Sequence, residues 1–403
     1  MPDILSQGRD HEPGTRRWRT LAVVAVLVAA AAVAVGLRLP SSGHGHHAHP
    51  RHPAAATSRP PSGPTVVSLP SEPDGIAGPT RPWPASVRLP VTGSQPAWYW
   101  PGTGRKQTVG GLPKVTVGYA FTRAVGGWAV QPGSASDPSC ANCAGRPLPV
   151  YFLDDQSPSA TLVGVADAVA PAVQAGRLWL TTFPAGASLD TAAGTGQEVS
   201  LSGARIGPSV RLPPGYVIAR ATSRGLLLQP AAIGRATTTD RLWNPARPQA
   251  GRTFSNVIAT GQNEIAWAPP CATRCRARVL NLATGRATVV TVPRGSTAAS
   301  ASFSPDGRLL ALQVSYSTGS AGGSLAMQLE VASVATGRLT AVRGTWASSD
   351  ALVSFGWPAD GDSLVAELGF TTKVQLTAWR PDDTRLAVVS LGRREAVTAI
   401  VTG

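Results

Sequence analysis

Four cysteines, set in two close pairs, are the residues of this chain best suited to chemistry. They stand as Cys140-Ala-Asn-Cys143 and Cys271-Ala-Thr-Arg-Cys275. Cysteines three or four residues apart can form a local disulfide, contribute to a zinc site or act as a redox pair. A redox pair is typical of a βαβ setting, which the sequence around Cys140 does not show. A zinc site would require both pairs to meet at one ion.

Adjacent carboxylates occur twice, as Asp154-Asp155 and Asp382-Asp383. Paired carboxylates can serve as acid and base in glycan hydrolysis. Each pair, however, stands where an apolar strand gives way to a turn, and such positions favour Asp because its side chain hydrogen-bonds the local backbone. We therefore expect a structural role in turns, with glycan chemistry as the alternative.

Histidine is absent from the whole C-terminal part of the chain. The histidines are His11, His44, His46, His47, His49 and His52. Residues 83–403 therefore cannot contain a Ser-His-Asp or Cys-His mechanism, or a metal site that uses imidazole. A GxxxxGK[ST] phosphate loop is also absent. We expect no cofactor, no metal site and no catalytic constellation in this part of the chain.

The composition is that of a turn-rich β protein. The chain has 43 glycines and 36 prolines, whereas charged residues make up 14%. The net charge of +14 comes almost wholly from arginine, which together with the alanine, glycine and proline content is typical of GC-rich coding. We expect no nucleic-acid partner, and binding of nucleic acid or another polyanion is the alternative explanation of this charge.

The N-terminal part predicts one membrane span. Every residue from 21 to 37 is Ala, Val, Leu or Gly, and ~17–25 apolar residues cross a bilayer core. Arginines crowd the N-terminal side of this run, so the positive-inside rule leaves the N-terminus in the cytoplasm. We predict a cytoplasmic tail over 1–19, a signal-anchor helix over 20–37 and an extracytoplasmic remainder. Cleavage after Ala32-Val33-Ala34, which would release a secreted protein, is the alternative.

Residues 38–82 are dominated by Pro, Ser, Ala, Gly and His. Such a segment cannot bury enough apolar surface to order itself, so we predict a disordered linker. Its histidines could bind a transition metal or respond to mild acid, but a disordered tract cannot fix ligand geometry, which favours no specific role. Residues 83–403 are expected to form one extracytoplasmic domain.

That domain contains a repeated turn and strand, which is clearest at residues 303–312, FSPDGRLLAL. Pro305 presets φ and Asp306-Gly307 provides the reversal, so that the apolar residues after it continue as a buried strand. Looser copies follow at a spacing close to the ~40–50 residues of a propeller blade. The units begin at Gly126, Gly176, Ser223, Asn263, Gly307 and Gly361.

A second hairpin occurs within the same repeat. Residues 281–290 and 333–342 both read strand, Ala-Thr-Gly-Arg turn, strand, and two hairpins make a four-stranded antiparallel blade. The turn Ser304-Pro305-Asp306-Gly307 resembles the Ser-Pro-Asp-Gly repeat of TolB-like and WD40-like propellers, and residues 355–368 resemble a degenerate second copy. This resemblance implies a fold and no particular activity.

We predict an all-β fold, a propeller of about seven four-stranded blades, with six as the second choice. At ~45 residues per blade, residues 83–403 suffice for about seven. Six units are visible, and the seventh would combine the first strands of the domain with a terminal strand from Glu395, which closes the ring. The tryptophans are expected to pack between blades, with Trp98-Tyr99-Trp100 the most exposed cluster.

On this repeat both cysteine pairs occupy the loop between the second and third strands of their own blades. Extracytoplasmic conditions are oxidising, and residues three or four apart across a reversal can approach the ~5.5 Å Cα separation of a disulfide. We therefore predict two disulfides, Cys140–Cys143 and Cys271–Cys275, on one face of the propeller. We expect this face to bind the partner.

The functional expectation is a non-enzymatic, membrane-tethered propeller with a monomeric ectodomain that binds a protein or polymer in the cell envelope. One alternative is a propeller enzyme that acts on glycans through paired carboxylates. Another is an envelope sensor that works through a membrane partner, since a tail of residues 1–19 has no room for a signalling domain.

Overall fold

The computed structural model of the chain describes residues 80–91, 95–115, 118–133, 144–232, 239–248, 251–269, 271, 275–317, 325–348, 352–358, 361–369, 374–381 and 383–391. The chain divides into two units, residues 1–49 and 50–403, and every described residue belongs to the second. The predicted cytoplasmic tail and membrane span, most of the predicted linker, and the strand from Glu395 lie outside the described residues. Within the described ranges, no helix has the length and apolar character needed to cross a bilayer.

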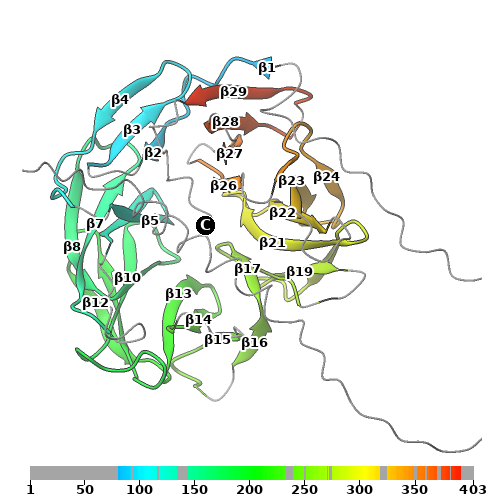
Figure 1. Ribbon diagram of the computed structural model, residues 1–403. Helices are drawn as coiled ribbons and strands as arrows, with labels where there is room; N and C mark the ends of the chain where they lie inside the picture. The colour runs from blue at the N-terminus through cyan, green and yellow to red at the C-terminus, as the bar shows by residue number, and fades with distance from the viewer. Residues whose placement is uncertain are drawn as a thin grey trace, which may run out of the picture. The chain divides into compact units, whose positions relative to one another are not determined.

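Seven antiparallel sheets are arranged around a common centre, as the blades of a propeller (Figure 1). Blade 1 comprises β2 (Leu89–Val91), β3 (Ala97–Trp100) and β4 (Arg105–Thr108). Blade 2 comprises β5 (Tyr119–Ala124), β6 (Gly127–Pro132), β7 (Leu148–Asp154) and β8 (Ala160–Ala166), and blade 3 comprises β9 (Ala168–Pro171), β10 (Arg177–Thr182), β11 (Thr195–Ser200) and β12 (Arg205–Arg211).

The remaining four blades follow in chain order. Blade 4 comprises β13 (Tyr216–Thr222), β14 (Gly225–Pro230), β15 (Thr239–Trp243) and β16 (Arg252–Ser255), and blade 5 comprises β17 (Val257–Thr260), β18 (Glu264–Trp267), β19 (Arg276–Asn281) and β20 (Ala287–Thr291). Blade 6 comprises β21 (Ser296–Phe303), β22 (Leu309–Ser317), β23 (Leu325–Ser333) and β24 (Leu339–Ala341), with β25 (Ala347–Ser348) paired to β23. Blade 7 comprises β26 (Leu352–Gly356), β27 (Leu364–Gly369), β28 (Val374–Trp379) and β29 (Leu386–Leu391).

The six units expected from the sequence are the second strands of blades 2 to 7. Strand β22 shows why these strands were recognisable. Leu310 and Leu312 are fully buried in the core shared with blade 5, and Ala311 is fully buried in the core shared with blade 7. Because both faces of the strand are covered, its apolar run is continuous and can be read from the sequence alone. The prediction of a seven-bladed, all-β propeller is confirmed.

The N-terminal strand β1 (Thr80–Arg81) adds to the outer edge of blade 7. It pairs in parallel with β29, Thr80 opposite Leu386 and Arg81 opposite Ala387. The first strands, β2 to β4, form a three-stranded sheet, and the strand from Glu395 that was expected to complete this blade lies outside the described residues. The described sheets therefore reach back into the predicted 38–82 linker, and β1 links the first part of the domain to the last blade.

Tryptophans pack mainly between blades, as expected, but the exposure expected for the Trp98-Tyr99-Trp100 cluster is wrong for its first two residues. Trp98 is 1% exposed and Tyr99 is 4% exposed. Trp98 lies in the core shared by blades 1 and 2, where its Nε1 donates to the Ser157 carbonyl at 3.0 Å, and Tyr99 lies in the core shared by blades 1 and 7. The cluster is the second strand of blade 1, so it is covered on both faces like its counterparts.

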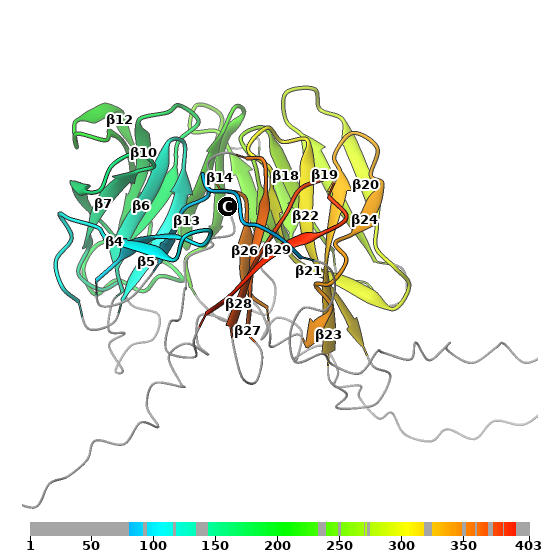
Figure 2. The same cartoon turned by 90° about the horizontal axis from the view of Figure 1, so that it is seen from above.

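The two faces of the ring carry different connections. Strands cross the thickness of the ring, so that their connections gather at its two faces (Figure 2). Because the strands alternate in direction, one face carries the hairpins between the first and second and between the third and fourth strands. The opposite face carries the loops between second and third strands and the links from blade to blade. We call these the hairpin face and the disulfide face.

Candidate functional site on the disulfide face

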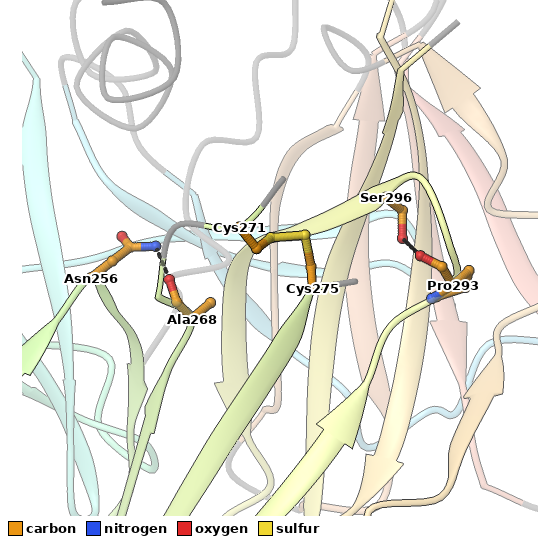
Figure 3. Close-up of a disulfide and its surroundings, with 6 residues drawn as sticks. All are labelled: Asn256, Ala268, Cys271, Cys275, Pro293 and Ser296. Carbon is orange, nitrogen blue, oxygen red and sulfur yellow. Dashed lines mark hydrogen bonds between the residues drawn. A yellow bond between two sulfur atoms is a disulfide. The ribbon is translucent and has the colours of Figure 1, made fainter. Parts of the chain in front are cut away.

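A disulfide joins Cys271 and Cys275 in the loop between β18 and β19 of blade 5 (Figure 3). Their Cα atoms are 5.4 Å apart, as expected for a bridge of this kind. Cys275 is buried in the core shared by blades 5 and 6, whereas Cys271 is exposed. The prediction of this disulfide and of its loop is confirmed. Cys140 and Cys143 lie outside the described residues, between β6 and β7, so their bond stays a prediction.

Asn256, in the link from blade 4 to blade 5, fixes the start of this loop. It is the one described non-glycine residue with a positive φ, 56°, a conformation that Asn tolerates better than most residues. Its carbonyl accepts a hydrogen bond from Ala268 N at 3.0 Å. Its Nδ2 donates to the Ala268 carbonyl at 2.9 Å (Figure 3). The blade link and the loop are therefore joined through both the backbone and the side chain of Asn256.

The end of the loop is attached to the link from blade 5 to blade 6. The Cys275 carbonyl accepts a hydrogen bond from Val292 N at 3.4 Å. The next turn is closed by Ser296, whose N and Oγ both donate to the Pro293 carbonyl, at 3.2 and 2.8 Å. The described ends of the disulfide loop, Ala268 and Cys275, are thus hydrogen-bonded to the neighbouring blade links.

Three exposed arginines lie along the junction of blades 4 and 5, near Trp267. The Arg252 guanidinium lies 5.7 Å from the Trp267 ring and 5.2 Å from that of Phe254. Arg278 stands directly opposite Trp267 in the β18–β19 pairing. Arg276 is two residues before Arg278 on the same side of β19 and directly follows Cys275. We call Arg252, Arg276 and Arg278 the arginine cluster.

The charge of the arginine cluster is uncompensated among the described residues. No hydrogen bond or ion pair joins its guanidinium groups to a described side chain or carbonyl. The nearby carboxylate is Asp240, opposite Phe254 in blade 4, which is buried and accepts a hydrogen bond from Val257 N at 3.2 Å. Burial raises the pKa of Asp240 to about 6, although that hydrogen bond opposes the rise. The site can therefore attract anions.

None of these three arginines is predicted as a site residue from the sequence. Two of the three arginines could have been found from the sequence. Arg276 and Arg278 alternate with Ala277, so a strand at this position places both arginines on the same side. Arg252 belongs to another blade, and nothing in its neighbourhood along the chain connects it to Trp267. Only the packing of blade 4 against blade 5 brings the Arg252 guanidinium to the Trp267 ring, whose residue stands opposite Arg278 in the β18–β19 pairing.

The adjacent carboxylates lie on the hairpin face, where they hold turns. Asp154 Oδ1 accepts a hydrogen bond from Gln156 N at 2.6 Å. Asp155 forms a bidentate ion pair with Arg123, with N–O distances of 2.6 and 2.7 Å. Asp383 pairs with Arg81 at 2.7 Å, and Asp382 lies outside the described residues. Asp154, Asp155 and Asp383 are thus engaged in local structure.

The Ser304-Pro305-Asp306-Gly307 motif forms the expected turn at the hairpin face. Gly307 N donates to the Ser304 carbonyl at 2.8 Å, which closes the turn. Ser304 Oγ donates to Asp306 Oδ1 at 2.6 Å and accepts from Leu309 N at 2.9 Å. Every polar side chain of the motif is therefore used to hold the turn at the start of β22.

No metal site is visible in the described part of the chain, where three or more His, Cys, Asp or Glu side chains nowhere gather closely enough to hold an ion. The site contains the Cys271–Cys275 disulfide, the aromatic pair Phe254 and Trp267, and the three arginines of the cluster. These groups can bind a ligand through noncovalent contacts.

Comparison with known proteins adds little beyond the fold. No protein-family model and no curated protein sequence matches the chain. Among solved structures, TolB from Acinetobacter baumannii is similar at 14% identity over 73% of this chain and 77% of that chain, with a TM-score of 0.39. A protein from Lactobacillus plantarum is similar at 10% identity over 78% and 98% of the two chains, with a TM-score of 0.45.

The acylaminoacyl peptidase of Pyrococcus horikoshii is similar at 10% identity, with a TM-score of 0.49, over 74% of this chain and 48% of that chain. This chain therefore spans about half of the peptidase. Likenesses of this strength carry no functional argument. The seven-bladed fold is established by the pairing of the strands themselves.

Proposed function

We propose that this chain is a non-enzymatic, membrane-tethered propeller whose disulfide face binds a protein or polymer partner in the cell envelope. The observation that carries the proposal is the Cys271–Cys275 disulfide, whose loop is hydrogen-bonded at its two ends to Asn256 and Val292 and lies beside arginines that have no ion pair among the described residues. A recognition surface gains affinity when its loops are held in place before binding, since less conformational entropy is then lost.

The membrane tether in this proposal is supported by the apolar run over residues 21–37, which meets the length requirement of a span. The non-enzymatic character is supported by the lack of histidine in residues 83–403 and by the ion pairs and turns that engage Asp154, Asp155 and Asp383.

Retention of envelope material by the purified full-length chain tests this proposal. The wild-type chain, immobilised in detergent, is compared with a Cys271→Ser/Cys275→Ser variant and with Arg308→Gln, a control on the hairpin face whose side chain is 86% exposed. We expect the wild type and the control to retain the same envelope component and the double serine variant to lose most of it. Equal retention by all three chains would contradict the assignment of the disulfide face.

A further inference from the structure

We infer that the partner of the disulfide face is an anionic polymer, whose phosphate or carboxylate groups bind the arginine cluster Arg252, Arg276 and Arg278. This inference rests on the proposed binding function and names the chemistry of the partner. Three observations support it: the geometry of the cluster, the burial of the nearby carboxylates Asp240 and Glu264, and the position of Arg276 directly after Cys275.

The geometry suits a chain with repeated charges. Arg276 and Arg278 lie on one side of β19, and alternate residues of a strand are about 6.6 Å apart. Arg252 reaches the same place from β16 of blade 4, over the rings of Phe254 and Trp267. Two arginines in a row along a strand and a third across the blade junction can bind successive anionic groups of one polymer.

The guanidinium groups of the cluster favour anions that can accept hydrogen bonds through two oxygen atoms. Arginine presents a planar set of donors that matches a phosphate or carboxylate in a bidentate way, and it remains charged at all physiological pH values. The Phe254 and Trp267 rings meet edge to face, with centroids 5.2 Å apart. This aromatic pair contributes no charge, and contact with it keeps the Arg252 guanidinium in place. The donors of the cluster are thus left for a ligand.

Among the described residues, the carboxylates of the strands that form the site are buried. Asp240 is 7% exposed, and Glu264, at the other end of β18, is 8% exposed. Glu264 accepts a hydrogen bond from Asn263 N at 3.1 Å. Both carboxylates are covered and bonded to the backbone, so neither neutralises the exposed guanidinium groups. An external anion therefore meets an unopposed positive charge.

Binding of defined polymers to the full-length chain tests the inference. The probes are linear polyphosphate and poly-glutamate, with neutral dextran as a reference, and affinity is measured over a series of salt concentrations. The variants are Arg252→Gln/Arg276→Gln/Arg278→Gln and the charge-matched control Arg205→Gln/Arg211→Gln/Arg286→Gln, which removes three exposed arginines from β12 and from the β19–β20 turn. Near-UV circular dichroism and thermal unfolding establish that both variants are folded.

We expect the wild type and the control to bind at least one of the two anionic polymers and not dextran, whereas the cluster variant binds at least tenfold more weakly. For polyphosphate the logarithm of the binding constant should fall with the logarithm of salt concentration at a slope of about −2, by analogy with three contacts on a single-stranded nucleic acid. Preference for one probe distinguishes phosphate from carboxylate as the group bound.

Equal weakening in the cluster variant and the control would overturn the inference, because net charge alone would then explain binding. So would binding of neither anionic polymer by the wild type. If envelope retention is still lost in the Cys271→Ser/Cys275→Ser variant in that case, the proposed function stands and only the anionic partner fails. If that retention is unaffected, the proposed function fails as well.

Discussion

Gly307 packs directly against the carboxyl group of Glu264, so that a Cβ at position 307 would lie 2.9 Å from Glu264 Cδ. The turn of blade 6 therefore contacts the second strand of blade 5. On its other side Pro305 lies against Gly361 of blade 7, where a Cβ would be 3.4 Å from Pro305 Cγ. The Ser-Pro-Asp-Gly turn joins three blades at the hairpin face, which gives it a structural role beyond the local reversal.

Gly307→Ala should destabilise the propeller more than the same change at a glycine with open surroundings. Gly307 has φ 69° and a close neighbour, whereas Gly285 has φ 73° with nothing within 4 Å of its added Cβ. Backbone strain applies to both changes and is worth about 1 kcal/mol, but only Gly307→Ala also displaces Glu264. We expect Gly307→Ala to lose about 2–3 kcal/mol in urea unfolding and Gly285→Ala about 1 kcal/mol. Equal losses would show that Glu264 moves aside freely.

Glu367→Gln should stabilise the chain above neutral pH. Glu367 is 2% exposed, its Oε2 has no hydrogen-bond partner among the described residues, and it stands opposite Ser354 in blade 7. The equivalent pair in blade 6 already carries an amide, since Ser300 Oγ donates to Gln313 Oε1 at 2.8 Å. In each of the two blades the first strand has a β-bulge just before the serine of the pair, after Ala298 in blade 6 and after Leu352 in blade 7. The two pairs therefore occupy equivalent positions.

The pH dependence of this effect has a definite sign. Burial raises the pKa of Glu367 from 4.5 to about 8. The folded state thus binds a proton that the unfolded state releases, so the stability due to the neutral carboxyl is complete below pH 4.5 and is lost as pH rises to about 8. We expect the glutamine variant to gain about 1–3 kcal/mol over wild type at pH 8 and little at pH 4.5. A difference that does not change between these pH values would contradict a buried neutral acid.

Asn256→Ala should loosen the disulfide loop, whereas Asn256→Gly should do so less. Alanine loses the Nδ2 bond to the Ala268 carbonyl and is strained at φ 56°, whereas glycine loses the bond but adopts the angle freely. We expect losses of about 2 and about 1 kcal/mol in unfolding free energy, respectively. Hydrogen exchange of Ala268 N reports the loosening directly, and unchanged protection in the alanine variant would contradict the role assigned to Asn256.

Reduction of the Cys271–Cys275 bond should affect the loop more than the fold. A cross-link that closes so short a loop stabilises by about 2 kcal/mol at most through chain entropy. We therefore expect the Cys271→Ser/Cys275→Ser variant to keep its β-sheet circular dichroism and to unfold at slightly lower urea. Thiol titration of the denatured, unreduced chain should find no free thiol, since the second predicted bridge, Cys140–Cys143, accounts for the other two cysteines. Two free thiols would show that this second bridge is not formed.

The blades could be predicted from the sequence because their second strands are marked by features of neighbouring residues. Turn residues such as Pro305 and Gly307 precede strands that are apolar on both faces. Both the turn and the apolar strand are visible in a short stretch of consecutive residues. The burial of Trp98 was not predicted, because it depends on contact with blade 2, which the residues around Trp98 do not reveal. The two-residue strand at Thr80 is too short for any periodicity to reveal.

The candidate site was predicted in part. Spacing alone placed Cys271 and Cys275 in one loop, since a local disulfide depends on residues close in sequence. The arginine cluster depends on contact between Arg252 of blade 4 and Trp267 of blade 5. The burial of Glu367, whose Oε2 has no hydrogen-bond partner among the described residues, depends on the residues that cover blade 7. Contacts between blades are not encoded in the pattern of any single blade, so these features required the structure.

Site-specific photo-cross-linking in growing cells tests most directly whether the disulfide face is the binding face. A cross-linking amino acid is placed in the full-length chain at the exposed position 291, opposite Arg276 at the end of β20, or at position 308, on the exposed turn of the hairpin face. We predict that irradiation shifts the mass of the chain at position 291 and leaves it unchanged at position 308. Adducts at position 308 and none at position 291 would contradict the account.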